Sequence, residues 1–160
     1  MDVLWSPWRQ NYMATAGQEA ACIFCAALEA RDDVSMGIVL RGETSFVILN
    51  KYPYTTGHVM IVPYVHGAEL ASCDGEMLAE IMRLAQRMQT ALAEVYHPQG
   101  YNLGMNLGRA AGAGVVGHLH MHLLPRWTGD ANFMTTVGET RVNPEDLAAT
   151  YGKLSKSLAR

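Results

Sequence analysis

Short apolar runs alternate with turn-forming segments over much of the chain. Three of these runs, at residues 38–40, 45–49 and 58–62, are rich in aliphatic and β-branched side chains. Two more cover residues 101–107 and 118–124. Runs of this length, bounded by Gly, Pro and Asn, predict five β-strands. The short connections between the first three predict a meander.

A different spacing, with apolar residues three and four positions apart, predicts helices elsewhere. It is clearest between Asp74 and Tyr96, where Asp74 suits the N-cap position and Pro98 follows the expected end. Residues 23–33 predict a short helix, and residues 143–158 a final one. The apolar positions of the long helix are Met77, Leu78, Ile81, Leu84, Ala85, Met88, Leu92 and Val95.

Together these elements predict the α+β class, with an antiparallel, meander-like sheet of five strands. The helices, among them one long helix and a C-terminal helix, are all expected on one side of the sheet. A chain of 160 residues is long enough to bury a substantial core, and no repeat or linker divides it. We therefore expect a single domain over residues 1–160, with an N-terminal arm at 1–18 and a C-terminal extension at 131–160.

Composition and net charge argue against some classes of partner. Apolar residues make up 49% and charged residues 17% of the chain, which is typical of a globular protein. A formal charge of −3 argues against a nucleic-acid partner, because tracking a phosphate backbone needs a clustered basic surface. No apolar stretch is long enough to cross a membrane. We expect a cytoplasmic protein without nucleic-acid or membrane partners.

Imidazole and aliphatic side chains alternate at Gly117-His118-Leu119-His120-Met121-His122-Leu123. In a strand this puts three histidines on one face. A metal site and a row of imidazoles facing an anion are the competing interpretations. Because His118 and His122 would lie about 13 Å apart along a strand, convergence of all three rings on one ion is strained. The phosphate interpretation is favoured, since imidazole can donate hydrogen bonds and act as a nucleophile.

The histidine segment resembles the signature of the histidine triad family, whose members hydrolyse or transfer nucleotidyl groups. The resemblance extends from about Cys22 to Asp130 and includes the segments 50–58 and 62–66. Segments 4–9, 106–109 and 125–133 are similar to a bacterial branch described as diadenosine tetraphosphate phosphorylases.

The resemblance implies a mechanism. His120 would attack the α-phosphorus and form a nucleotidyl-histidine intermediate, while His122 and His58 would donate to the non-bridging oxygens. The expected substrate is a dinucleoside polyphosphate, with diadenosine tetraphosphate converted by phosphorolysis to ADP and ATP. Whether water or inorganic phosphate accepts the nucleotidyl group stays open at this stage.

Several residues are candidates for substrate binding. The loop Gly112-Ala113-Gly114 can bring backbone N–H groups close to phosphate, although it lacks the hydroxyl residue of some relatives. Asn106 is a candidate contact to the polyphosphate and Asn50 to the ribose, and a role as a turn residue is the open alternative for each. Trp127 would either stack on a base or anchor the C-terminal segment.

A zinc site is the expected use of the Cys22-x-x-Cys25 pair. In zinc-bearing relatives the other ligands match His66 and His118, which would complete a closed tetrahedral, structural site. A redox pair and two buried thiols are the alternatives.

Three other functions stay open, one of them a zinc-dependent hydrolase that would lose activity as soon as its metal is stripped. A nucleoside phosphoramidase would use the same nucleophile, and a non-catalytic nucleotide-binding module would bind adenine nucleotides without turnover. The resemblance also implies a homodimer formed through the long helix and the sheet edge. No organic cofactor is expected.

Overall fold

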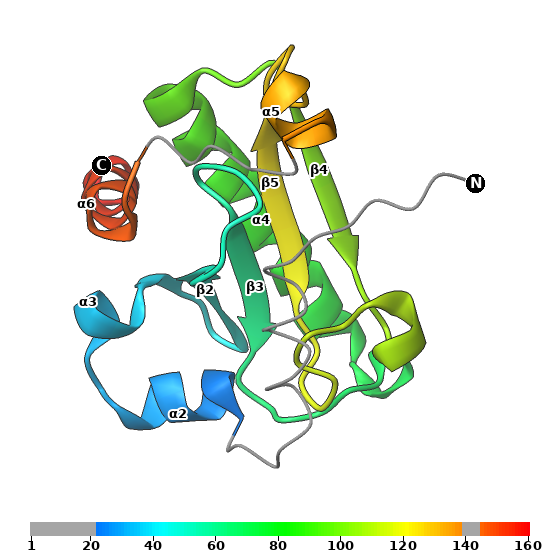
Figure 1. The fold of residues 1–160 in the computed structure, drawn as a ribbon. Coiled ribbons are helices and arrows are strands. Elements are labelled where there is room, and N and C mark those ends of the chain that lie inside the picture. The colour runs from blue at the N-terminus through cyan, green and yellow to red at the C-terminus, as the bar shows by residue number, and fades with distance from the viewer. Residues whose placement is uncertain (1–21, 139–144) are drawn as a thin grey trace.

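The computed structural model describes residues 22–138 and 145–160, and the predicted N-terminal arm at 1–18 lies outside them. One antiparallel sheet forms the centre of the fold, with strand order β1-β2-β3-β5-β4 (Figure 1). Its strands are β1 (Ile38–Arg41), β2 (Ser45–Leu49), β3 (Val59–Pro63), β4 (Gly100–Met105) and β5 (Met121–Arg126). The α+β class and the five-stranded antiparallel sheet are confirmed, and β1, β2 and β3 form the expected meander.

The helices are α2 (Ile23–Glu29), α3 (Asp33–Met36), α4 (Gly75–Tyr96), α5 (Phe133–Thr136) and α6 (Leu147–Leu158), with short 3-10 turns at η1 (Leu70–Ser72) and η2 (Arg109–Ala111). α4 connects β3 to β4 and passes behind the sheet in Figure 1. This long connection leaves β4 at the open edge, with β5 between it and β3. No helix in the described ranges has the length and apolar character needed to span a bilayer.

α4 begins as the sequence predicts, because the Asp74 carboxylate accepts a hydrogen bond from the Met77 N–H. Its apolar side packs on one face of the sheet and forms the larger core. The alternation of β2 and β3 places Val47 and Ile61 in that core, both fully buried. Other members are Leu49, Val59, Ile81, Leu84, Met88, Leu92, Met121, Leu123 and Leu154 from α6.

The opposite face of the sheet is covered in part by α2. Phe24 and Ala27 of α2 pack against Phe46, Met60 and Val62, which alternate with the residues of the larger core. Placing every helix on one side was therefore wrong. The reason is that β2 and β3 are buried at every position, so side chains on both faces of these strands need cover.

Two predicted helix boundaries also change. The helix expected over 23–33 divides into α2 and α3, with Arg31 between them at a φ of 53°. The final helix begins at Leu147 rather than 143, since the Asp146 carboxylate caps it by accepting from the Ala149 N–H. Residues 143 and 144 lie outside the described ranges.

The last two predicted strands are shorter than expected at the end near the histidines. β4 ends at Met105, and β5 begins at Met121, so the segment 118–120 precedes the strand. Its neighbour in the sheet would be the end of β3, where Pro63 has no N–H to donate. The Leu119 N–H donates instead to the Gly67 carbonyl at 2.7 Å.

The turn before His58 contains a position that requires glycine. Gly57 has a φ of +77°, and a Cβ there would lie 2.9 Å from Leu92 Cδ2 and 3.2 Å from Pro125 Cγ. We expect Gly57→Ala to lower the free energy of unfolding by about 1–3 kcal/mol, because strain and overpacking add. Urea unfolding measures this. Gly75→Ala is the matched control, since its added Cβ meets nothing within 4 Å; an equal loss in both variants would contradict the prediction.

Candidate functional site

The hydrogen bonds around His120 define its tautomer. His120 Nδ1 lies 2.8 Å from the backbone carbonyl oxygen of His118. A carbonyl only accepts, so Nδ1 carries the proton and donates it. Nε2 therefore retains its lone pair, which is the state that a nucleophilic imidazole needs. The ring is buried and packs beside Phe24 of α2, with ring centroids 5.2 Å apart.

A second chain of hydrogen bonds orients His122. The backbone N–H of Tyr54 donates to His58 Nδ1 at 3.1 Å, so the proton of a neutral His58 is on Nε2. His58 Nε2 lies 2.9 Å from His122 Nδ1 and donates to it. His122 is thereby left with its proton on Nε2, as a hydrogen-bond donor. Both ring nitrogens of His58 thus face protein groups, and His58 acts on its surroundings through His122.

Burial keeps these rings neutral. Loss of solvent lowers the pKa of His120, although its bond to the His118 carbonyl partly opposes this. Burial, together with the charge that His120 would carry, lowers the pKa of His122 to about 4. The neutral rings of His120 and His122 offer a substrate one lone pair and one N–H. This pair of groups suits attack on phosphorus, whereas charged imidazolium rings would suit neutralisation of phosphate charge.

Four residues predicted as metal ligands come together next to this row. Cys22 and Cys25 at the start of α2 meet His66 and His118, and their four ligand atoms all lie within 4.8 Å of one another. His118 Nε2 donates to the Pro63 carbonyl at 2.9 Å, so its Nδ1 has the lone pair and faces the two sulfur atoms. This is the tautomer that a metal ligand requires.

The distances fit a tetrahedral shell. Cys22 Sγ and Cys25 Sγ are 3.3 and 3.7 Å from His118 Nδ1, and Cys25 Sγ is 3.4 Å from His66 Nδ1. Zinc–sulfur and zinc–nitrogen bonds of about 2.3 and 2.1 Å produce tetrahedral N···S edges of roughly 3.6 Å. Burial and the adjacent Cys22 thiol raise the pKa of Cys25. The cluster is a possible metal site.

A cavity of about 230 Å³ lies beside His122. Of the predicted substrate residues, Asn106 lines it. Asn102 and Gly104 of β4, which were not among the predicted site residues, line the cavity as well. The alternation Asn102-Gly104-Asn106 is visible in the sequence, but its meaning depends on β4 being the neighbour of the histidine strand.

The other predicted substrate residues lie in different settings. Asn50 supports His58, since its Oδ1 accepts from the Tyr52 N–H and its Nδ2 lies 3.3 Å from His58 Nδ1. In the segment 112–114, the Gly112 and Ala113 N–H groups donate to carbonyls of the same loop. Half-buried Trp127 follows β5, where its backbone N–H donates to the Asp130 carboxylate. Their roles in substrate binding stay predictions.

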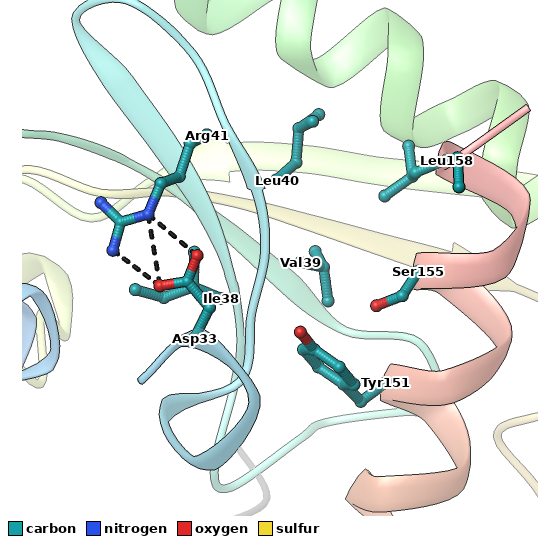
Figure 2. Close-up of a pocket in the computed structure, with 9 residues that line it drawn as sticks. Asp33, Ile38, Val39, Leu40, Arg41, Tyr151, Ser155 and Leu158 are labelled. Carbon is teal, nitrogen blue, oxygen red and sulfur yellow. Dashed lines mark hydrogen bonds and ion pairs between the residues drawn. The ribbon is translucent and has the colours of Figure 1, made fainter. Parts of the chain in front are cut away.

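A larger cavity, of about 360 Å³, lies elsewhere, between β1 and α6. Figure 2 shows the Arg41–Asp33 ion pair on one side of it and Tyr151 and Ser155 of α6 on the other. Its described lining contains no histidine or cysteine. The smaller cavity is therefore the one connected with the histidine chemistry.

Comparison with known proteins agrees with this geometry. The model of the HIT domain matches residues 32–129. The chain is 38% identical to a protein of Mycobacterium tuberculosis named AP-4-A phosphorylase, over 98% of this chain and 84% of the relative. It is 33% identical to the adenosine 5'-monophosphoramidase of Saccharomyces cerevisiae, over 71% of this chain and 67% of that protein.

A solved structure shows the same fold. It is a zinc-bound histidine triad family protein from Mycobacterium smegmatis, with a TM-score of 0.71 and 30% identity over 87% of this chain and 94% of that one. With the match of the family model over more than half of the chain, this chain belongs to the HIT family.

The lowered pKa of His122 predicts how stability depends on pH. In the unfolded chain a histidine binds its proton near pH 6.5, whereas folded His122, which faces His58, His120 and Tyr54, does so only near pH 4. Its contribution is complete above pH 6.5 and is lost as the pH falls toward 4. We expect His122→Asn to lose less stability than the wild type between pH 6.5 and 4, measured by urea unfolding.

The control for this experiment is His97→Asn, which changes an exposed histidine at the end of α4. It should keep the wild-type pH dependence. Parallel curves for the wild type and His122→Asn would contradict the prediction.

Proposed function

We propose that this protein cleaves dinucleoside polyphosphates, with diadenosine tetraphosphate as the substrate and inorganic phosphate as the acceptor, yielding ADP and ATP. The observation that carries the proposal is the His120 ring, whose Nδ1–H is held by the His118 carbonyl so that Nε2 is the nucleophilic atom. The 38% identical relative named AP-4-A phosphorylase supports the choice of substrate.

In the first half of the reaction, His120 Nε2 attacks the α-phosphorus, and the bond to the leaving polyphosphate breaks. The electron pair of that bond departs with the leaving nucleotide, here ATP. His122 Nε2–H donates to an oxygen on phosphorus, where negative charge is concentrated in the transition state. His58 positions His122 through its hydrogen bond to His122 Nδ1, and Asn50 lies against His58.

In the second half, an acceptor oxygen attacks the nucleotidyl-histidine. The P–N bond breaks, and its electron pair returns to Nε2 of a neutral imidazole. Phosphate as acceptor produces ADP, and water produces AMP. The lowered pKa of His120 suits this step, because a weakly basic nitrogen is a good leaving group.

We also propose that the cluster of Cys22, Cys25, His66 and His118 holds zinc. Its support is the match of the N···S distances to a tetrahedral shell and the zinc bound by the relative from Mycobacterium smegmatis. With four protein ligands the ion would have a structural role and supply no open position for water. The homodimer would use the open edge formed by β4, where Leu103 is 45% exposed.

The products of diadenosine tetraphosphate test the reaction. With inorganic phosphate present we expect ADP and ATP in equal amounts. His120→Ala should lower the rate on the order of 1,000-fold or more, because the nucleophile is lost. Separation of the nucleotides by ion-exchange chromatography measures both, and a phosphorus-labelled substrate detects the covalent adduct on the wild type.

His97→Asn is the matched control and should keep wild-type activity, since its side chain is exposed. AMP and ATP, independent of phosphate, would point to hydrolysis instead. Cleavage of adenosine phosphoramidate alone would favour the activity of the yeast relative. Unchanged turnover by His120→Ala would overturn the mechanism.

Metal analysis tests the zinc proposal. We expect about one zinc per chain in the wild type and almost none in Cys25→Ser. Loss of the ion should lower the Tm by about 10 °C or more, because each kcal/mol lost shifts the Tm of a chain of this size by about 2–4 °C. Cys73→Ser is the control, since Cys73 lies outside the cluster. The proposal would be contradicted if the wild type is purified without zinc and its Tm equals that of Cys25→Ser.

A further inference from the structure

The cavity beside His122 is formed by one face of β4. In the register of β4 and β5, Gly104 is opposite His122 and Asn102 is opposite Leu124. Directly paired residues share a face of the sheet, so Asn102 and Gly104 lie on the histidine face. Asn106 follows the end of β4 and also lines the cavity. Two amides therefore flank a glycine next to the His122 ring.

Gly104 creates the space for this cavity. A Cβ at this position would meet no atom within 4 Å, and the φ angle is not in the left-handed region, so the backbone does not require glycine. Neither turn geometry nor close packing accounts for a glycine at this position of the strand. Because glycine has only a hydrogen atom in place of a side chain, Gly104 leaves room beside His122 for another molecule.

The polar groups of the cavity are directed by their partners. Arg126 Nη1 donates to Asn102 Oδ1 at 2.5 Å, so the amide NH₂ is the part of Asn102 that has hydrogen-bond donors to offer. The remaining groups of the Arg126 guanidinium pair with Asp130, at 2.5 and 2.7 Å. With His122 Nε2–H, the cavity offers hydrogen-bond donors without a net positive charge.

The strand register places this cavity on the far side of His122 from α2, because His122 lies between Met60, which packs with α2, and Gly104 of β4. Phe24 of α2 packs beside His120, the His120 and His122 rings are 4.9 Å apart between centroids, and His122 lines the cavity. A phosphorus atom that is bound at the Nε2 atoms of both rings thus has α2 on one side and the β4 cavity on the other.

We infer that the β4 cavity is the subsite for the acceptor phosphate, with Asn102 as a binding residue and Gly104 as the residue that admits it. This rests on the proposed function. The leaving polyphosphate departs from the side opposite the nucleophile, and the acceptor attacks from that same side, so one subsite serves both in turn. An unprotonated oxygen of HPO₄²⁻ attacks phosphorus, the P–N bond to His120 breaks, and a P–O–P bond forms.

The test compares Gly104→Val with Gly100→Val. Both glycines are on the same face of β4, a Cβ at either meets nothing within 4 Å, and β-branched residues suit an edge strand. Gly100 is not among the described residues that line the cavity. The measurement is the ratio of ADP to AMP formed from diadenosine tetraphosphate at increasing phosphate concentrations, with circular dichroism and Tm to verify the fold.

We expect Gly104→Val to lower the ADP to AMP ratio roughly tenfold or more at a fixed phosphate concentration, and Gly100→Val to keep the wild-type ratio. Asn102→Ala should lower it by a similar factor, the effect of losing one hydrogen bond to a charged group. A normal ratio in Gly104→Val, with ADP still formed, would overturn this inference and leave the proposed function intact.

If the wild type forms no ADP, the phosphorolysis itself is wrong, and direct binding decides the subsite. Inorganic phosphate is then titrated into nitrogen-labelled protein while the side-chain amide of Asn102 is followed by NMR. A saturable shift that Gly104→Val abolishes and Gly100→Val retains supports the subsite. The absence of such a shift in the wild type overturns it.

Discussion

The hydrogen bond from the His120 ring to the His118 carbonyl is the contact on which the site depends. It assigns the proton to Nδ1 and the lone pair to Nε2. The same His118 donates through its ring to the Pro63 carbonyl and turns Nδ1 toward the two cysteine sulfurs. One residue thus joins the end of β3, the cysteine cluster and the proposed nucleophile. Because the segment 118–120 precedes β5, these contacts hold it in place of the sheet ladder.

The position of the site follows from the unequal cover on the two faces of the sheet. α4 and α6 bury one face with apolar side chains, whereas short α2 covers only part of the other. The histidines occupy the region between α2 and the open edge of β4. Phe24 and the neighbouring rings remove water from His120 and His122, which keeps both neutral. The chemistry of these rings is therefore a consequence of where the apolar cover ends.

The spacing of apolar residues predicted those parts of the fold that are formed by one continuous helix or by neighbouring strands. The long helix with its Asp74 cap, the three strands of the meander and the class were all readable from spacing. It did not predict α2 on the second face, because strands with apolar side chains on both faces do not say which element covers each face. The early end of the ladder at Pro63 was also missed, since it depends on which strand pairs with the histidine segment.

The candidate site was predictable to a similar degree. Family resemblance brought Cys22, Cys25, His66 and His118 together correctly, although 96 residues separate Cys22 from His118 in sequence. Tautomers and the distinction between His58 and His122 depend on backbone groups such as the Tyr54 N–H, which no side-chain pattern reveals. Asn102 and Gly104 gained meaning only through the register with β5.

The amide-lined cavity offers neutral hydrogen-bond donors rather than cations. The described residues that line it include no lysine or arginine, and Arg126 reaches it only through Asn102 while paired with Asp130. Neutral donors orient an anion with less affinity than a cation would, since hydrogen bonds to ionised groups are strongest when both partners are charged. In the proposed phosphorolysis, a subsite that releases a polyphosphate before it admits a phosphate benefits from this weaker hold. The histidine row then supplies the directed interactions at phosphorus, and the cavity needs only to provide space and alignment.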